Sequence, residues 1–255
     1  MLDDWLALCT AAARPALPQD WWTAWSLAPA TLALLVPLLG HAAAPPRRSG
    51  LAAGSARAWR MAGLSLLALA LLSPLCRLAA TLAWAHMLQL MLAIAGAGLL
   101  AAGWRRPRAG PAALAAAVAG HGALLWLWHL PVVYAAVLTQ PVLHVATYAL
   151  LVLSAFWFWQ AVRGALPDGP PWAGLMALLV TMAHTGLLGA LLTFAPAALY
   201  PLHAAGARAW GLDPLQDQQL AGLLMWVPAG LVYLLAGAAL LGRWLRGPRA
   251  APQAR

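Results

Sequence analysis

Long apolar stretches alternate with short polar segments along the chain. A helix needs about 20 mainly apolar residues to cross the hydrocarbon core of a bilayer. Stretches that approach this length lie at residues 22–44, 59–75, 79–103, 112–137, 141–162, 171–195 and 217–241. This pattern predicts an all-α fold: a polytopic membrane protein whose seven transmembrane helices form one bundle. We expect residues 1–255 to form a single membrane domain.

The positions of the arginines predict the orientation of that bundle. Twelve of the fifteen arginines fall on one side of the predicted membrane, whereas Arg14, Arg77 and Arg208 fall on the other. Basic residues gather on the cytoplasmic side of membrane proteins. The N-terminus is therefore expected outside and the C-terminus inside.

Composition supports a membrane protein and excludes several other classes. The chain is 64% hydrophobic and 8% charged, whereas a soluble domain carries about 25% charged residues. The net charge of +9 does not imply nucleic-acid binding, because the arginines are spread over short loops and form no single face. The sequence contains no glycine-rich phosphate loop, no Ser/His/Asp set and no pair of carboxylates suited to hydrolysis. We therefore expect the protein not to be an enzyme.

Histidines mark the predicted outer end of the helices. An ionisable residue inside a membrane is costly and by default indicates a functional site. Five of the seven histidines fall at this end: His86, His129, His144, His184 and His203. His121 is expected near mid-membrane, and His41 near the cytoplasmic end of the first helix.

Methionines and polar residues extend the histidine pattern. His86 and Gln89 are three residues apart and Met87 and Met91 are four apart, so each pair shares a helix face. Asp217 opens the last helix from the same side, and a stripe on that helix contains Gln218, Gly222 and Met225. Imidazole and thioether groups suit copper, and methionine favours Cu(I). The sequence therefore predicts a copper site made of histidine and methionine in the outer leaflet.

Simpler interpretations exist for each of these residues. A single histidine in a helix bundle more often forms an interhelical hydrogen bond than binds a metal, and methionines often only fill the core. Cys9 and Cys76 both map to the outer side, where a disulfide is permitted and where Cys76 could act as a soft ligand. Of these alternatives for the cysteines, free and unreactive thiols are favoured.

Several segments together resemble one protein family. They are His86–Gln89, His129–Pro131, Gln140–His144, His184–Pro196 and, most specifically, Gly211–Pro228. These segments resemble the CtaG-like family, the caa-type cytochrome c oxidase assembly factors, which are bacterial membrane proteins with seven helices. The similarity extends from about residue 79 to residue 241.

The resemblance implies a role in maturing a haem–copper oxidase, in which the protein helps copper to reach or remain in the membrane subunit. It implies oxidase subunits and the lipid bilayer as partners, and a location in the inner membrane of a bacterial cell. The residues that it points to as metal ligands are His86, His144 and His184, with Met87 and His129 as auxiliary ligands. Around them, the resemblance places Gln89, Asp217, Gln218 and Met225. Members of the family often carry a further histidine where this chain has Leu90, and an acid and a second histidine where it has Thr147 and Tyr148.

Two other functions fit the same residues. His121 and His184 on facing helices could hold a b-type haem between them, as in a membrane electron carrier. Alternatively, the protein is a scaffold without any cofactor, in which the histidines are interhelical hydrogen-bond partners.

Overall fold

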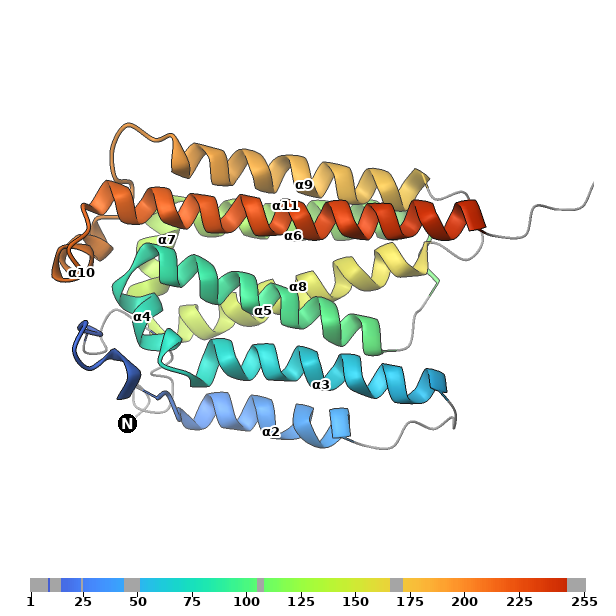
Figure 1. The fold of residues 1–255 in the computed structure, drawn as a ribbon, viewed down its shortest axis with the longest axis horizontal. Helices are drawn as coiled ribbons and strands as arrows, with labels where there is room; N and C mark the ends of the chain where they lie inside the picture. Colours follow the sequence, from blue (N-terminus) through green and yellow to red (C-terminus); the bar gives the residue numbers. More distant parts are fainter. Residues whose placement is uncertain are drawn as a thin grey trace, which may run out of the picture.

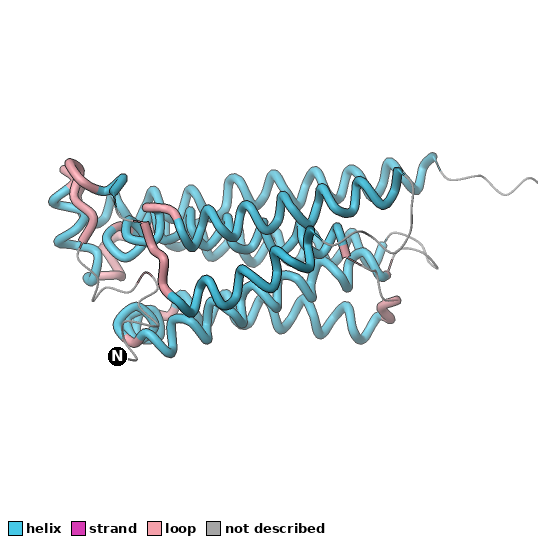
Figure 2. The backbone as a smooth tube through the Cα atoms, turned by 90° about the horizontal axis from the view of Figure 1, so that it is seen from below, coloured by secondary structure: helices cyan, strands magenta, loops and turns pink. Residues whose placement is uncertain are grey.

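The computed structural model describes residues 9, 15–23, 25–43, 51–104, 108–165 and 172–246. Helices account for 85% of the structure, and these residues form no strand. The long helices run back and forth along one axis, and their connections lie at the two ends of the bundle (Figures 1 and 2). The predicted all-α class is confirmed.

The elements follow one another without any β-structure between them in the described ranges. In chain order they are η1 (Trp21–Thr23), α2 (Pro29–Ala43), α3 (Leu51–Leu72), α4 (Leu75–Thr81), α5 (Ala83–Gly103), α6 (Pro111–His129), α7 (Pro131–Thr139), α8 (Pro141–Gly164), α9 (Trp172–Thr193), η2 (Pro201–His203), α10 (Ala204–Ala209) and α11 (Pro214–Arg246).

Six of the described helices are long and apolar enough to cross a membrane: α3, α5, α6, α8, α9 and α11. The stretch predicted at residues 22–44 corresponds to α2, which has 15 residues and is shorter than the usual span of about 20. The protein is thus a multi-pass membrane protein, while the count of seven spans and the orientation stay predictions.

Two predicted spans are each divided by one extended residue. Leu82 separates α4 from α5 with φ −128° and ψ 134°, so the span predicted at residues 79–103 contains a break. Leu130 separates α6 from α7 in the same way, at φ −63° and ψ 127°. Pro131 then occupies the first turn of α7, where its missing N–H costs nothing. The span predicted over residues 112–137 thus consists of two helices, α6 and α7, which meet at Pro131.

One end of the bundle carries the short helices, and we call it the capped end. It contains α4, α7 and α10, the start of α5, α8 and α11, and the end of α6 and α9 (Figure 1). His86, His129, His144 and His203 all belong to segments at this end. His41 lies in α2, and its side chain is outside the described part of the structure.

Glycines bring two pairs of helices into close contact. A Cβ atom added to Gly63 on α3 would lie 2.6 Å from the carbonyl oxygen of Gly96 on α5. A Cβ atom added to Gly222 on α11 would lie 2.6 Å from the carbonyl oxygen of Gly189 on α9. Small residues at such contacts let membrane helices approach closely where hydrophobic burial does not drive association.

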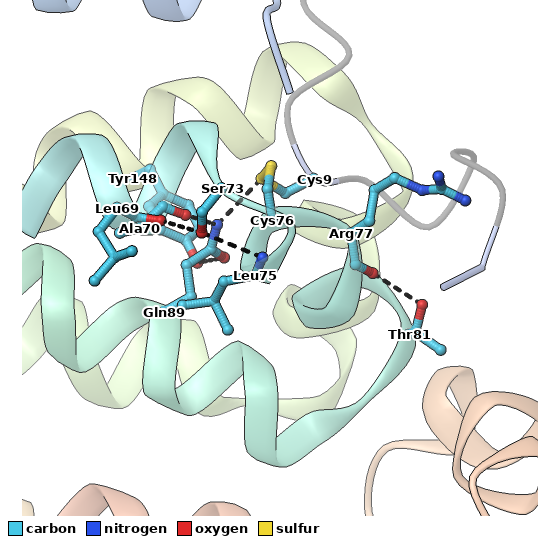
Figure 3. Close-up of a disulfide and its surroundings, with 10 residues drawn as sticks. All are labelled: Cys9, Leu69, Ala70, Ser73, Leu75, Cys76, Arg77, Thr81, Gln89 and Tyr148. Carbon is cyan, nitrogen blue, oxygen red and sulfur yellow. Dashed lines mark hydrogen bonds between the residues drawn. A yellow bond between two sulfur atoms is a disulfide. The ribbon is translucent and has the colours of Figure 1, made fainter. Parts of the chain in front are cut away.

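A disulfide joins Cys9 to Cys76 at the capped end (Figure 3). The Cα atoms are 4.8 Å apart, within the usual range for a disulfide. The preference for free thiols was therefore wrong, and neither sulfur is available as a metal ligand in this state. The bond ties the N-terminal segment to α4.

Candidate functional site

His86 lies at the centre of an aromatic cage at the capped end. Its side chain is fully buried. The centroid of its ring lies 5.8 Å from the ring centroid of Trp128, 5.1 Å from that of Tyr134 and 6.2 Å from that of Tyr148. The backbone of Ala79 interacts weakly with it. Neither ring nitrogen of His86 reaches a partner with hydrogen-bond geometry in the described part of the chain.

Three more histidines surround His86 closely enough to interact with it electrostatically: His129, His144 and His203. The ring of His203 is 6.3 Å from that of His86. The ring of His144 is 4.8 Å from Tyr148, which also contacts His86. The structure thus brings together His86, His129 and His144, three of the five ligands named from the sequence, and adds His203. We call these four residues, with Met87, the histidine cluster.

His129 and Met87 face each other through atoms that both hold lone pairs. Nδ1 of His129 lies 2.7 Å from the carbonyl oxygen of Leu125, and since a carbonyl only accepts, Nδ1 carries the hydrogen. In the neutral ring Nε2 is then unprotonated. This nitrogen lies 3.4 Å from the sulfur of Met87. A neutral imidazole and a thioether, without a hydrogen between them, are a ligand pair suited to Cu(I).

The connection between α9 and α11 covers the histidine cluster. The hydroxyl of Tyr134 lies 2.7 Å from Nε2 of His203, and the ring of Tyr134 stacks on Tyr200 at 4.1 Å. The hydroxyl of Tyr200 donates to the carbonyl oxygen of His129 at 2.9 Å. Burial lowers the pKa of His203 to about 4, although the nearby backbone of Thr81 acts in the opposite direction. The imidazole of His203 is therefore neutral at neutral pH.

Gln89 connects the histidine cluster to the disulfide. Its side-chain nitrogen donates to the carbonyl oxygen of Ala70 at 2.8 Å and to the sulfur of Cys9 at 3.1 Å. Its side-chain oxygen accepts the hydroxyl hydrogen of Tyr148 at 2.6 Å. Figure 3 shows Gln89 between Tyr148 and the disulfide. Gln89 therefore fixes the position of Tyr148, whose ring contacts both His86 and His144.

Asp217 and Gln218 act on the backbone around the cluster. The carboxylate of Asp217 accepts hydrogen bonds from the backbone N–H groups of Ala83 and Trp84 at the start of α5. The side-chain oxygen of Gln218 accepts from the backbone N–H of Leu199. In every hydrogen bond described for these two side chains, the partner is a backbone group. Their role near the site is therefore to hold the backbone in place. Met225 and Leu90 are buried in the hydrophobic core.

His184 lies in a different place from His86. A Cβ atom added to Gly122 on α6 would lie 3.0 Å from Nε2 of His184, and His184 interacts electrostatically with His121. Both ring nitrogens of His184 are buried without a hydrogen-bond partner in the described ranges. The contacts of His184 thus group it with His121 rather than with His86 and His144.

His121 has a defined partner of its own. Its Nδ1 lies 2.9 Å from the hydroxyl of Ser154, and that hydroxyl donates its hydrogen to the carbonyl oxygen of Leu151. His121 therefore donates to Ser154 through Nδ1. This contact is an interhelical hydrogen bond between α6 and α8 of the kind found in many membrane bundles.

Metal binding by these histidines stays a prediction. In the described ranges no group of three histidine, cysteine, aspartate or glutamate side chains has an arrangement that could hold a metal ion. Met87 therefore matters, because a thioether adds a ligand to a set of histidines. From the sequence, His203 was expected at the same end as the other cluster members but was given no role, and Tyr134 was not singled out. The turn at η2 that brings them together has no signal in the apolar pattern.

Residues 112–247 match the family described as cytochrome c oxidase caa3 assembly factor (Caa3_CtaG). No curated protein and no solved structure matches the chain. The matched region begins in α6 and extends past the end of α11, so it contains His129, His144, His203 and Asp217. Because it covers more than half of the 255 residues, the chain belongs to the family of cytochrome c oxidase caa3 assembly factors.

Proposed function

We propose that the protein aids copper delivery to a haem–copper oxidase in the bacterial inner membrane, and that the histidine cluster holds the copper in transit. Family membership supports a role in assembling the oxidase. The observation that carries the copper step is the 3.4 Å separation between Nε2 of His129 and the sulfur of Met87. Two lone-pair atoms that face each other in a buried site are best accommodated by a cation between them.

His86 and His144 supply further nitrogen atoms to the same site. Both nitrogens of His86 and Nδ1 of His144 are buried without a hydrogen-bond partner in the described residues. Leaving a buried polar atom unpaired costs about 1–3 kcal/mol. A bound Cu(I) ion would offset that cost for the nitrogens that coordinate it. His129 and Met87 would receive the ion, and His86 and His144 would complete its coordination.

The alternative of a cofactor-free scaffold explains fewer of these residues. Interhelical hydrogen bonds account for His121, which contacts Ser154, and for His203, which contacts Tyr134. They do not account for His86 or for the pairing of His129 with Met87. The proposed role is not catalytic, in agreement with the family.

Copper binding by the purified protein tests the proposal. Detergent-purified protein is titrated with Cu(I) in competition with a chromogenic chelator. Wild type is expected to bind about one ion, as suits a single soft site. The double variant Met87→Leu/His129→Gln is expected to lose this binding, and His121→Gln, which lies outside the cluster, is the control. Equal binding by wild type and the double variant would exclude the site.

The haem alternative has a separate readout. His121 and His184 interact electrostatically, so they remain the pair to which a haem would bind. A b-type haem held by two histidines gives sharp absorption bands when reduced, whereas a Cu(I) site does not absorb there. An optical spectrum of the protein purified from its host therefore separates the two functions.

A further inference from the structure

The side-chain amide of Gln89 joins the disulfide to the aromatic cage around His86 (Figure 3). One of its N–H groups donates to the sulfur of Cys9 and the other to the carbonyl oxygen of Ala70. Because both hydrogens are directed at these acceptors, the amide oxygen faces the hydroxyl of Tyr148, which donates to it. Gln89 is fully buried, so bulk water does not replace a partner that is lost. The sulfur of Cys9 therefore helps to set the position of Tyr148.

Tyr148 forms one wall of the cage in which two of the proposed copper ligands lie. Its ring centroid is 4.8 Å from that of His144 and 6.2 Å from that of His86. It is also 5.0 Å from the ring centroid of Trp128, which packs on both histidines. A shift of Tyr148 therefore changes the space around both imidazoles. Two side chains, Gln89 and Tyr148, thus connect the disulfide to this part of the histidine cluster.

The N-terminal segment also contacts the connection that covers the histidine cluster. The backbone N–H of Ala16 donates to the hydroxyl of Thr81 on α4, and the indole of Trp210 donates to the carbonyl oxygen of Ala16. Trp210 directly follows α10, and α10 directly follows His203. The N-terminal segment is therefore held on α4 by a covalent bond at Cys9 and by a hydrogen bond at Ala16, and it contacts the covering connection through Trp210.

The backbone of Cys9 lies in the left-handed region, with φ 48°. This conformation is unfavourable for residues other than glycine and persists only where the surrounding structure imposes it. The bond to Cys76 is such a constraint. When that bond is broken, Cys9 is expected to leave its place, and an N–H of Gln89 loses its acceptor. An unpaired N–H in a buried site is costly, so the arrangement around Gln89 should loosen.

We propose that the disulfide between Cys9 and Cys76 is a redox device that controls how firmly the histidine cluster holds its metal. With the bond formed, Gln89 and Tyr148 keep the cage closed. With the bond reduced, the cage loosens and the cluster holds Cu(I) less firmly. The choice of Cu(I) as the bound ion rests on the proposed function, whereas the connection from the sulfur of Cys9 to Tyr148 belongs to this chain.

A dithiol is the class of reductant that opens the device. Its thiolate attacks one sulfur of the disulfide and forms a mixed disulfide, and its second thiol then displaces the sulfur of the protein. Two electrons and two protons pass from the dithiol to Cys9 and Cys76, which become thiols, while the dithiol becomes a disulfide. Both sulfurs of the protein are buried, so the exchange requires the N-terminal segment to lift from α4.

The double variant Cys9→Ser/Cys76→Ser tests the open form. It lacks the bond and also lacks the thiols, which would themselves bind Cu(I). Detergent-purified proteins, kept below their unfolding midpoints, are titrated with Cu(I) in competition with a chromogenic chelator. The variant is expected to bind about fivefold more weakly than disulfide-bonded wild type, the factor expected when one hydrogen bond is lost. Equal affinities would overturn the proposal.

The substitution Tyr148→Phe tests the path from the disulfide to the cluster. It keeps the ring and removes the hydroxyl that Gln89 accepts, so it should weaken binding about fivefold in the disulfide-bonded chain. In the double serine variant it should have no further effect, because that path is already broken. Effects that simply multiply would contradict the path. Tyr233→Phe, in a separate part of the core, is the matched control and should bind as wild type does.

Chemical modification of histidine separates this proposal from the copper role. Diethyl pyrocarbonate acylates unprotonated ring nitrogens, and Nδ1 of His144 is buried without a hydrogen-bond partner in the described residues. Without copper, mass spectrometry should show faster modification of His144 in the double serine variant than in wild type, and equal rates at His184, which lies outside the cage. Faster modification in a protein that binds no copper would refute the copper role and leave the redox device in place. Copper binding with equal modification rates at His144 would refute the device alone.

Discussion

The carboxylate of Asp217 caps the start of α5 through the backbone N–H of Ala83, with Oδ2 of Asp217 2.8 Å from that nitrogen. Its other oxygen accepts from the N–H of Trp84 at 3.0 Å. The first N–H groups of a helix have no partner within the helix, and negative charge is favoured near them. His86 and Met87 follow within two turns, so a residue of α11 positions two members of the histidine cluster.

Asp217→Asn should therefore destabilise the protein and weaken the site. Asparagine retains one acceptor oxygen but loses the charge and the second acceptor, which should cost about 1 kcal/mol. Thermal unfolding of the detergent-purified protein, followed by tryptophan fluorescence, measures the change. Asp213→Asn is the control, because Asp213 is exposed and accepts one local hydrogen bond from Leu215, which asparagine can also accept. An equal loss in both variants would show that the cap of α5 has no special role.

The contact between Gly189 and Gly222 should not tolerate a methyl group. A Cβ atom at position 222 would lie 2.6 Å from the carbonyl oxygen of Gly189 and 2.7 Å from the nitrogen of Thr193, which are backbone atoms that cannot move alone. Gly222→Ala should destabilise the protein by about 1–3 kcal/mol. Gly230→Ala on the same helix has nothing within 4 Å of the added atom. It should leave stability unchanged or raise it by up to about 1 kcal/mol.

The helices could be predicted from the apolar pattern, but only one of the two breaks between them could. Pro131 gave a signal for the break at Leu130, because proline favours the first turn of a helix. Leu82 gave none, since it lies among residues that form helices readily. Its extended conformation separates α4 from α5. The next residue, Ala83, donates its backbone N–H to Asp217, which is 134 residues away in the sequence. A contact so distant in sequence leaves no local pattern.

The depth of the histidines could be predicted more reliably than their grouping. His86, His129 and His144 were expected near one end, and the structure brings them together. His184 was expected with them but contacts Gly122 and interacts with His121. Depth follows from the position along a helix, whereas grouping depends on the rotation of each helix about its axis. Helices that are apolar on all sides carry no amphipathic pattern that reveals this rotation.

The disulfide between Cys9 and Cys76 should contribute strongly to stability. It closes a loop of 67 residues, for which the loss of chain entropy in the unfolded state corresponds to about 4 kcal/mol. Insertion in the membrane already restricts the unfolded chain, so the measured effect should be nearer to 2 kcal/mol. The double variant Cys9→Ser/Cys76→Ser should unfold at a lower temperature than wild type. Adding a reductant should lower the wild-type midpoint to that of the variant and leave the variant unchanged. A wild-type midpoint that does not respond to complete reduction would contradict this role.

Acid should destabilise the capped end through His203. The pKa of this residue is about 4 in the folded protein, lowered by burial from an ordinary value of 6.5. Between these values the unfolded chain binds the proton more tightly, so stability falls as the pH falls. The free energy of unfolding that this shift contributes should be retained well above pH 6.5, begin to fall as the pH approaches 6.5, and be about 2 kcal/mol smaller at pH 5.

His203→Gln isolates this effect from those of the other histidines. The side-chain oxygen of glutamine can still accept the hydroxyl hydrogen of Tyr134, which lies 2.7 Å from Nε2 of His203, but glutamine does not titrate. Unfolding midpoints of the two proteins are compared in detergent from pH 7.5 to pH 5. The difference between wild type and the variant should move in favour of the variant as the pH falls. If the two curves stay parallel over this range, His203 is not held neutral by burial, and the covering of the cluster by the η2 turn is looser than the structure indicates.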